Sequence, residues 1–114
     1  MSVLTMSNLL PTLECADNDS KVRLVSFHLR DGGREALAYR YIMRVRFIAT
    51  GILQVYSMAG GISIHGRCLV PIFEALASGR AVVIREGTNT ESFARQQDEP
   101  HIDNLKFFDP NDEL

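Results

Sequence analysis

The stretch from residue 66 to residue 85, GRCLVPIFEALASGRAVVIR, constrains the fold most. Pro71 is compatible with a helix only near its first turn, and Gly79 supplies the left-handed residue that commonly closes a helix. The β-branched run at 81–84 predicts a short strand directly afterwards. On both sides of the proline and before the glycine, apolar side chains recur at helical spacing and form one stripe, which consists of Leu69, Ile72, Phe73 and Leu76. An amphipathic helix of this kind needs an apolar sheet to lie on.

The sequence before the helix supplies the strands of that sheet. Residues 22–29 and 36–48 are two apolar runs, and the Asp-Gly-Gly cluster at 31–33 between them is typical of a hairpin turn. Residues 52–58 and 62–65 predict two further strands, separated by a glycine turn. The order β-β-β-β-α-β therefore predicts an α+β fold: an antiparallel sheet of four to five strands with one helix packed on one face.

Alternation along residues 36–48 separates an apolar face from a basic face. The apolar face would carry Tyr39, Tyr41, Met43, Val45 and Phe47. The opposite face would carry Arg40, Arg44 and Arg46, together with Ile42 and Ile48. A hairpin loop of odd length would join this apolar face to that of the first strand, whereas a two-residue loop would mix polar side chains with the aromatic ones. We prefer the odd-length loop.

The chain is long enough for one domain with a modest core. We divide it into an apolar N-terminal arm and polar loop at 1–20, an α+β body at 21–87, and an acidic, mostly irregular C-terminal tail at 88–114. Leu105, Phe107 and Phe108 form the one dense apolar cluster of the tail, and we expect it to dock as a short strand or plug.

The net charge of −2 hides an asymmetry. Residues 21–87 carry a net charge of +6, whereas residues 88–114 carry −5. Ten of the twelve basic residues are arginine, which favours planar, bidentate contacts with carboxylates or phosphates. The basic face could therefore bind nucleic acid or an acidic protein segment, or the acidic tail could cover it.

Cysteine and histidine spacing gives no sign of a metal site. Cys15 and Cys68 lie far apart and read as two reduced thiols. The three histidines do not form a ligand set, and no catalytic set can be assembled from spacing, so we expect no cofactor and no catalysis. His65 and Arg67, close to the expected helix start, leave open a site for a small anionic ligand or an enzyme's substrate.

These observations favour a small non-catalytic binding or interaction module. Apolar residues in the arm at 3–13 and on the basic face require a second cover, so we expect a homodimer. The alternatives are a nucleic-acid-binding module and a binder of small anions. No apolar run is long enough to span a membrane and no secretory signal is evident, so we expect a cytoplasmic protein. The candidate binding residues are Arg40, Arg44, Arg46, His65 and Arg67.

Overall fold

The computed structural model describes residues 10–17 and 22–109 of the chain. The expectations for residues 3–9 of the N-terminal arm lie outside these residues. In order, the described elements are β1 (Leu13–Cys15), β2 (Leu24–His28), β3 (Arg34–Ala38), the 3-10 turn η3 (Tyr39–Tyr41), β4 (Ile42–Ala49), β5 (Ile52–Ser57), β6 (Gly60–Arg67), α1 (Val70–Ala77), β7 (Ala81–Arg85), α2 (Asn89–Ala94) and β8 (His101–Phe108).

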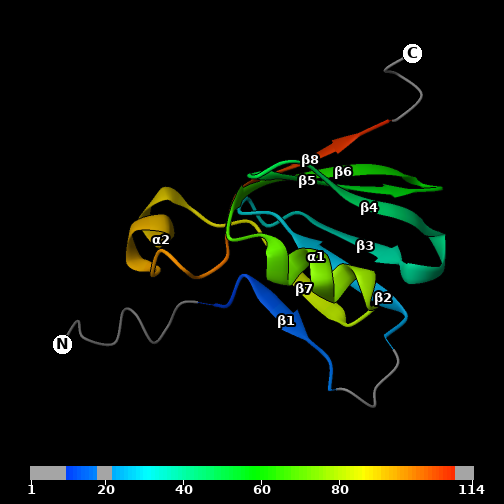
Figure 1. Cartoon of the computed structure of the whole chain (residues 1–114), viewed down its shortest axis with the longest axis horizontal. Helices are drawn as coiled ribbons and strands as arrows, with labels where there is room; N and C mark the ends of the chain where they lie inside the picture. Colours follow the sequence, from blue (N-terminus) through cyan, green and yellow to red (C-terminus); the bar gives the residue numbers. More distant parts are fainter. Residues whose placement is uncertain (1–9, 18–21, 110–114) are drawn as a thin grey trace.

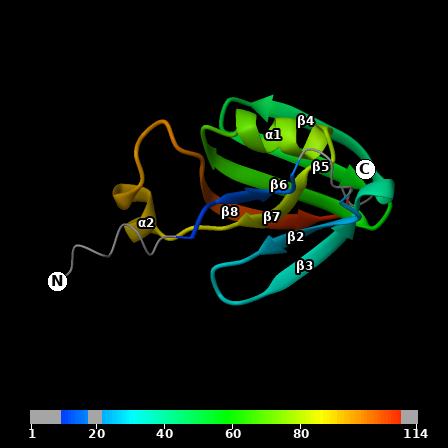
Figure 2. The same cartoon turned by 90° about the horizontal axis from the view of Figure 1, so that it is seen from below.

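The strands form two four-stranded sheets, which lie one above the other in Figure 1. Sheet 1 has the order β1-β7-β2-β3 and sheet 2 the order β4-β5-β6-β8. All neighbouring strands are antiparallel except β2 and β7, which are parallel. Helix α1 contacts β4 and β7 and lies along the β4 side of the molecule (Figure 2). The α+β class, with antiparallel pairing and a packed helix, is confirmed, although the strands are divided between two sheets.

The division between the sheets arises within residues 36–48. This segment leaves sheet 1 at the end of β3, turns through η3 and enters sheet 2 as β4. The Tyr39 hydroxyl donates a hydrogen bond to the Ala81 carbonyl at 2.7 Å, and the Met58 amide donates to the Tyr41 carbonyl at 3.0 Å. These two bonds fasten the turn to both sheets. The interpretation of residues 36–48 as one continuous strand is therefore wrong.

Strand β4 follows the expected alternation only after its first residues. A register shift between Ile42 and Arg44 leaves Met43 72% exposed, while Ile42 packs against the core. Val45 and Phe47 also pack against the core, as expected. Met43 belonged to the expected apolar face, so this part of the face assignment is wrong, and the reason is the irregular pairing with β5.

The hairpin between β2 and β3 has an odd-length loop, residues 29–33, as we expected. Gly32 adopts a φ of 98°, in the region that favours glycine, and the Leu29 amide donates to the Gly33 carbonyl. This loop sets the register, in which Phe27 lies opposite Glu35, and β3 ends at Ala38, before the tyrosines. The tyrosines expected beside Phe27 lie beyond this hairpin.

Helix α1 and strand β7 confirm the helix around Pro71 and the strand at 81–84, although residues 66 and 67 belong to β6. Pro71 lies in its first turn, and Gly79 adopts a φ of 71° just after its end. The Arg80 amide donates to the Ala75 carbonyl at 2.8 Å, which closes the helix. Its buried side chains are Ile72, Ala75 and Leu76.

Residues 88–109 are more regular than we expected for a mostly irregular tail. Thr88 and Glu91 form a capping box at the start of α2, and the following β8 pairs with β6 over seven residue pairs. Ile102 and Leu105 are buried in the same core as α1 and both sheets. The expected docking of the apolar cluster around Leu105 takes the form of an eight-residue strand. Within the described residues, no helix is long and apolar enough to cross a membrane.

Candidate functional site

The face of sheet 2 that is turned away from sheet 1, here called the outer face, brings together side chains from four strands. It lies at the top of Figure 1, where no described element covers it. Alternation sends Leu53 and Val55 of β5 into the core, so their neighbours point outward. The strand register arranges the outer face in three rows: Arg44, Tyr56, Gly61 and Phe108; Arg46, Gln54, Ser63 and Lys106; Ile52, His65 and Asn104.

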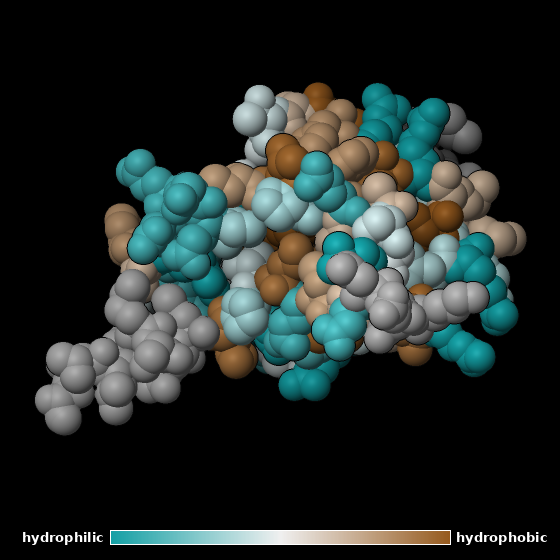
Figure 3. Space-filling view, turned by 60° about the horizontal axis from the view of Figure 1, so that its bottom comes forward, coloured by the Kyte–Doolittle hydropathy of each residue, from teal (hydrophilic) through white to brown (hydrophobic). Residues whose placement is uncertain are grey.

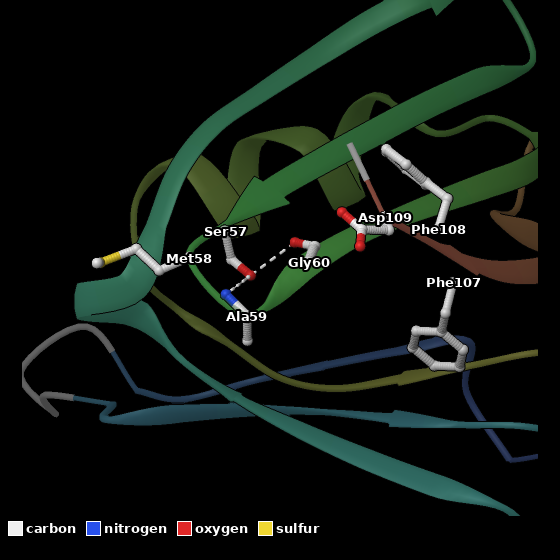
Figure 4. Close-up of a pocket in the computed structure, with 7 residues that line it drawn as sticks. All are labelled: Ser57, Met58, Ala59, Gly60, Phe107, Phe108 and Asp109. Atoms are coloured by element: carbon white, nitrogen blue, oxygen red, sulfur yellow. Dashed lines mark hydrogen bonds between the residues drawn. The ribbon is translucent and has the colours of Figure 1, made fainter. Parts of the chain in front are cut away.

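The first row holds an aromatic pair. The rings of Tyr56 and Phe108 meet edge to face, with centroids 5.8 Å apart and an angle of 83° between the planes. The Phe108 ring lies over Gly61, where a side-chain carbon would overlap it. In Figure 4, Phe107 and Phe108 point to opposite sides of β8, and only Phe108 belongs to the outer face. Both rings of the pair are half-buried, so part of each remains open to a ligand.

Polar side chains of the second and third rows are fixed beside the aromatic pair. The Tyr56 hydroxyl donates a hydrogen bond to the side-chain oxygen of Gln54. The Ser63 hydroxyl lies 3.0 Å from Nε2 of His65, and Ser63 itself is buried. These contacts hold hydrogen-bonding groups in place next to the rings, so less side-chain entropy is lost when a ligand binds.

The three rows carry three permanent cations and no carboxylate. Arg44, Arg46 and Lys106 are all exposed. The ion pairs recorded among the described residues, such as Arg30 with Glu86, involve none of them. A protein with a net charge of −2 therefore presents a locally positive surface on this face.

No family model, curated protein or solved structure matches this chain. The function therefore has to be inferred from the chemistry of the outer face.

The structure brings together three of the five candidate residues from the sequence. Arg44 and Arg46 share the outer face, and His65 joins them in the third row. Arg40 lies on η3, where its guanidinium stacks 5.0 Å from the centre of the Tyr41 ring.

Arg67 is turned away from the outer face and toward α2. It donates to the Ser92 hydroxyl at 3.1 Å and to the Ser92 carbonyl at 2.8 Å. Strand β6 continues through Arg67, and α1 begins only at Val70. His65 therefore lies in the sheet, and the expectation that it sits where the chain enters the helix is wrong.

Three residues of the face were missing from the sequence interpretation: Tyr56, Lys106 and Phe108. Tyr56 could have been placed on this face from the sequence, because Gln54 and Tyr56 alternate with the apolar Leu53 and Val55. Lys106 and Phe108 join the face only through the pairing of β8 with β6, which links residues more than forty positions apart. The alternation within residues 101–108 was masked by the acidic composition around it.

The described residues offer no metal centre. Among them, no three His, Cys, Asp or Glu side chains gather closely enough to hold an ion. Cys15 and Cys68 are both free thiols, and the Cys68 thiol donates to the Gln97 carbonyl at 3.0 Å. The outer face offers hydrogen-bonding side chains, aromatic rings and positive charges.

Proposed function

We propose that this protein is a non-catalytic binding module whose outer face binds single-stranded nucleic acid. The observation that carries the proposal is the first row, in which Arg44 lies directly opposite Tyr56 and the Tyr56 ring contacts Phe108. A base can stack on an aromatic side chain while a neighbouring arginine binds its phosphate, and each base offers such a face whatever its identity. Arg46 and Lys106 in the second row extend the positive surface beside the rings.

Single strands suit this face better than duplexes. In a duplex the bases are stacked on one another, so an aromatic pair on an open sheet gains little from them. Phosphates of a duplex would still be attracted to Arg44, Arg46 and Lys106, but by charge alone. An acidic protein segment would likewise use only the cations. Dependence on the aromatic pair therefore separates the proposed ligand from both alternatives.

We expect the full chain to bind a fluorescently labelled thymidine homopolymer, with an affinity that falls as salt rises. Arg46→Ala should weaken binding and reduce the slope of log affinity against log salt by about 0.7, the contribution of one phosphate contact to a single strand. Tyr56→Leu keeps an apolar side chain but removes the aromatic ring, and stacking on such a ring is worth about 1–3 kcal/mol per base. Fluorescence anisotropy at two salt concentrations measures both effects.

Arg23→Ala is the matched control, because Arg23 is exposed, carries the same charge and precedes β2 of the other sheet. It should leave the affinity and the salt slope unchanged. The proposal fails if the full chain does not bind the homopolymer at low salt. It also fails if Tyr56→Leu has no effect or a duplex binds as tightly, because the cations alone would then explain the binding.

We also propose that the protein is a homodimer at micromolar concentration. Strand β4 is an edge of sheet 2, and at its start Met43 is 72% exposed; Met58, whose amide bonds to Tyr41 just before β4, is 74% exposed. An open strand edge with apolar side chains is a surface that a second copy can cover. Met43→Lys should shift sedimentation equilibrium toward the monomer, whereas Phe93→Lys, on the 89% exposed Phe93 of α2, should not. Sedimentation at 12.8 kDa at every concentration would contradict the dimer.

A further inference from the structure

A second basic region lies at the α2 end of the molecule, on the side of sheet 1. Figure 2 shows the β2–β3 loop and α2 at this same end, and hydrophilic side chains gather there at the left of Figure 3. Between them is a cleft of about 500 Å³, large enough for a small metabolite. Four arginines from the hairpin, β7 and the end of α2 line it: Arg30, Arg34, Arg85 and Arg95. We call this the arginine cleft.

The floor of the arginine cleft contains a row of three basic side chains. Arg34 lies opposite His28 in the antiparallel pair of β2 and β3, and Arg85 lies opposite His28 in the parallel pair of β2 and β7. All three are on the face of sheet 1 that points away from the core, because Phe27 and Ile84, which precede His28 and Arg85 on their strands, are fully buried. Like charges directly opposite one another destabilise a sheet, so a protonated His28 between the two arginines is disfavoured. A bound anion would remove that penalty.

The carboxylates of the arginine cleft are already engaged within the protein. Glu86 accepts hydrogen bonds from the amides of Arg30 and Leu105, at 3.0 Å and 2.8 Å. Burial alone would raise the pKa of Glu86, but these bonds and the Arg30 guanidinium hold it below its usual value. Glu91 caps α2 through the Thr88 amide. Neither side chain is free to neutralise the remaining arginines.

Two arginines of the cleft keep unused donors. Among the described residues, no hydrogen bond or ion pair joins the Arg34 side chain to another group. Arg95 donates to the Leu10 carbonyl at 2.7 Å, but its Nε is buried without a partner in the described part of the chain.

Two further side chains near Arg95, His101 and Arg67, have buried nitrogens that make no hydrogen bond among the described residues. His101 is only 1% exposed; its Nε2 lies 3.5 Å from a carboxylate oxygen of Asp103, and neither ring nitrogen makes a hydrogen bond among the residues described. The Nε of Arg67 is also buried and makes no hydrogen bond within the described residues. Burial, and then the charges of Arg67 and Arg95, lower the pKa of His101, while Asp103 and Glu91 oppose this effect. The buried Nε donors of Arg67 and Arg95 therefore have no acceptor in the described part of the chain, and that of Arg95 belongs to a side chain that lines the arginine cleft, where an anion could accept from it.

We propose that the arginine cleft binds a small molecule bearing one or more phosphate groups, at a site separate from the outer face. The guanidinium groups of Arg34 and Arg95 supply planar pairs of donors that match phosphate oxygens. Arg85, already paired with Glu14, contributes charge from the floor of the cleft. The volume leaves room for more than a single phosphate.

Binding to the arginine cleft should strengthen as the pH falls. Burial, followed by Arg34 of β3 and Arg85 of β7, lowers the pKa of His28, and Glu14 of β1 acts in the opposite direction. A bound anion stabilises the protonated imidazole, so it raises this pKa and binds more tightly once His28 takes up a proton. Sulfate keeps the same charge over the pH range in which His28 takes up a proton. The affinity for sulfate, measured against pH, therefore reports on His28. His28→Gln should remove the added affinity.

Isothermal titration of the full chain with inorganic pyrophosphate tests the proposal. We expect saturable binding, weakened by about tenfold or more in Arg34→Ala, because one charge-assisted contact is lost. Arg34 has no partner in the described fold, so this variant should unfold at the same urea concentration as the parent. Arg23→Ala, at the opposite end of β2, and Arg46→Ala, on the outer face, should both bind as the parent does.

Three results would overturn the arginine cleft as a phosphate site. The first is no saturable heat with millimolar pyrophosphate. The second is equal weakening by Arg34→Ala and Arg23→Ala, which would indicate non-specific attraction. The third is loss of binding in Arg46→Ala, which would place the phosphate on the outer face. Amide chemical shifts that move around residues 28–34 and 85–95 would support the site independently.

Discussion

A chain that ends after Gly87 should fail to fold. This truncation removes β8, whose Ile102 is fully buried and whose Leu105 is 5% exposed. Deleting one such side chain costs about 2–5 kcal/mol, and a small domain has only about 5–15 kcal/mol of stability in total. The truncation also exposes the backbone edge of β6 and uncovers Ile62 and Ile64. We expect a far-ultraviolet circular dichroism spectrum without strand signal and no cooperative urea transition.

The matched control is a chain that ends after Asp109, which keeps β8 and should unfold cooperatively. A cooperative transition in the chain ending at Gly87 would contradict the expectation. It would show that residues 21–87 form a body of their own, as the sequence interpretation proposed.

Gly66→Ala should be the most destabilising of the small substitutions in sheet 2. The pairing of β6 with β8 shifts register between His65 and Gly66, and the two strands approach closely there. A methyl group on Gly66 would overlap the carbonyl oxygen of His101 and lie 2.9 Å from the Ile102 Cα. Both are backbone atoms of a paired strand, so relief requires β8 to move. We expect a loss of about 3 kcal/mol or more in urea unfolding, the upper end of the cost of overpacking.

Gly61→Ala, five residues earlier on the same strand, is the informative comparison. Its methyl group would overlap the ring of Phe108, a side chain that can rotate away. We therefore expect a loss of about 1 kcal/mol in stability and a clear loss of affinity for single strands, because Phe108 leaves Tyr56. Equal destabilisation by the two substitutions would show that the close approach at Gly66 is not rigid.

The helix and most strands could be predicted from local patterns, because their signals lie within a few residues. Pro71 lies in the first turn of α1 and Gly79 follows its end, while Gly51 separates β4 from β5 and Gly60 begins β6. The break at Tyr39–Tyr41 has no such signal, since the sequence there contains no glycine, proline, asparagine or aspartate. The turn depends on the bond from the Tyr39 hydroxyl to Ala81, which is distant in sequence.

The candidate site could likewise be predicted only where local patterns were enough. Alternation along β4 was enough to place Arg44 and Arg46 on one face. We expected the tyrosines of 36–48 in the core and therefore saw no aromatic side chain beside these arginines. Tyr56 comes next to Arg44 through the ladder of β4 and β5, and Phe108 through that of β6 and β8. Register between distant strands is set by the whole fold, and one sequence does not reveal it.

Strand β8 contributes to both the core and the outer face, so the proposed binding would be coupled to local opening. It pairs with β6 on one side only, and its residues alternate between the core, at Leu105, and the outer face, at Lys106 and Phe108. An edge strand of this kind is released at a lower free energy than the centre of a sheet. A ligand held by Lys106 and Phe108 binds only while β8 is closed, so its binding free energy adds to that of closure. Occupancy of the surface should therefore slow hydrogen exchange at the β8 amides, including those behind the buried Leu105.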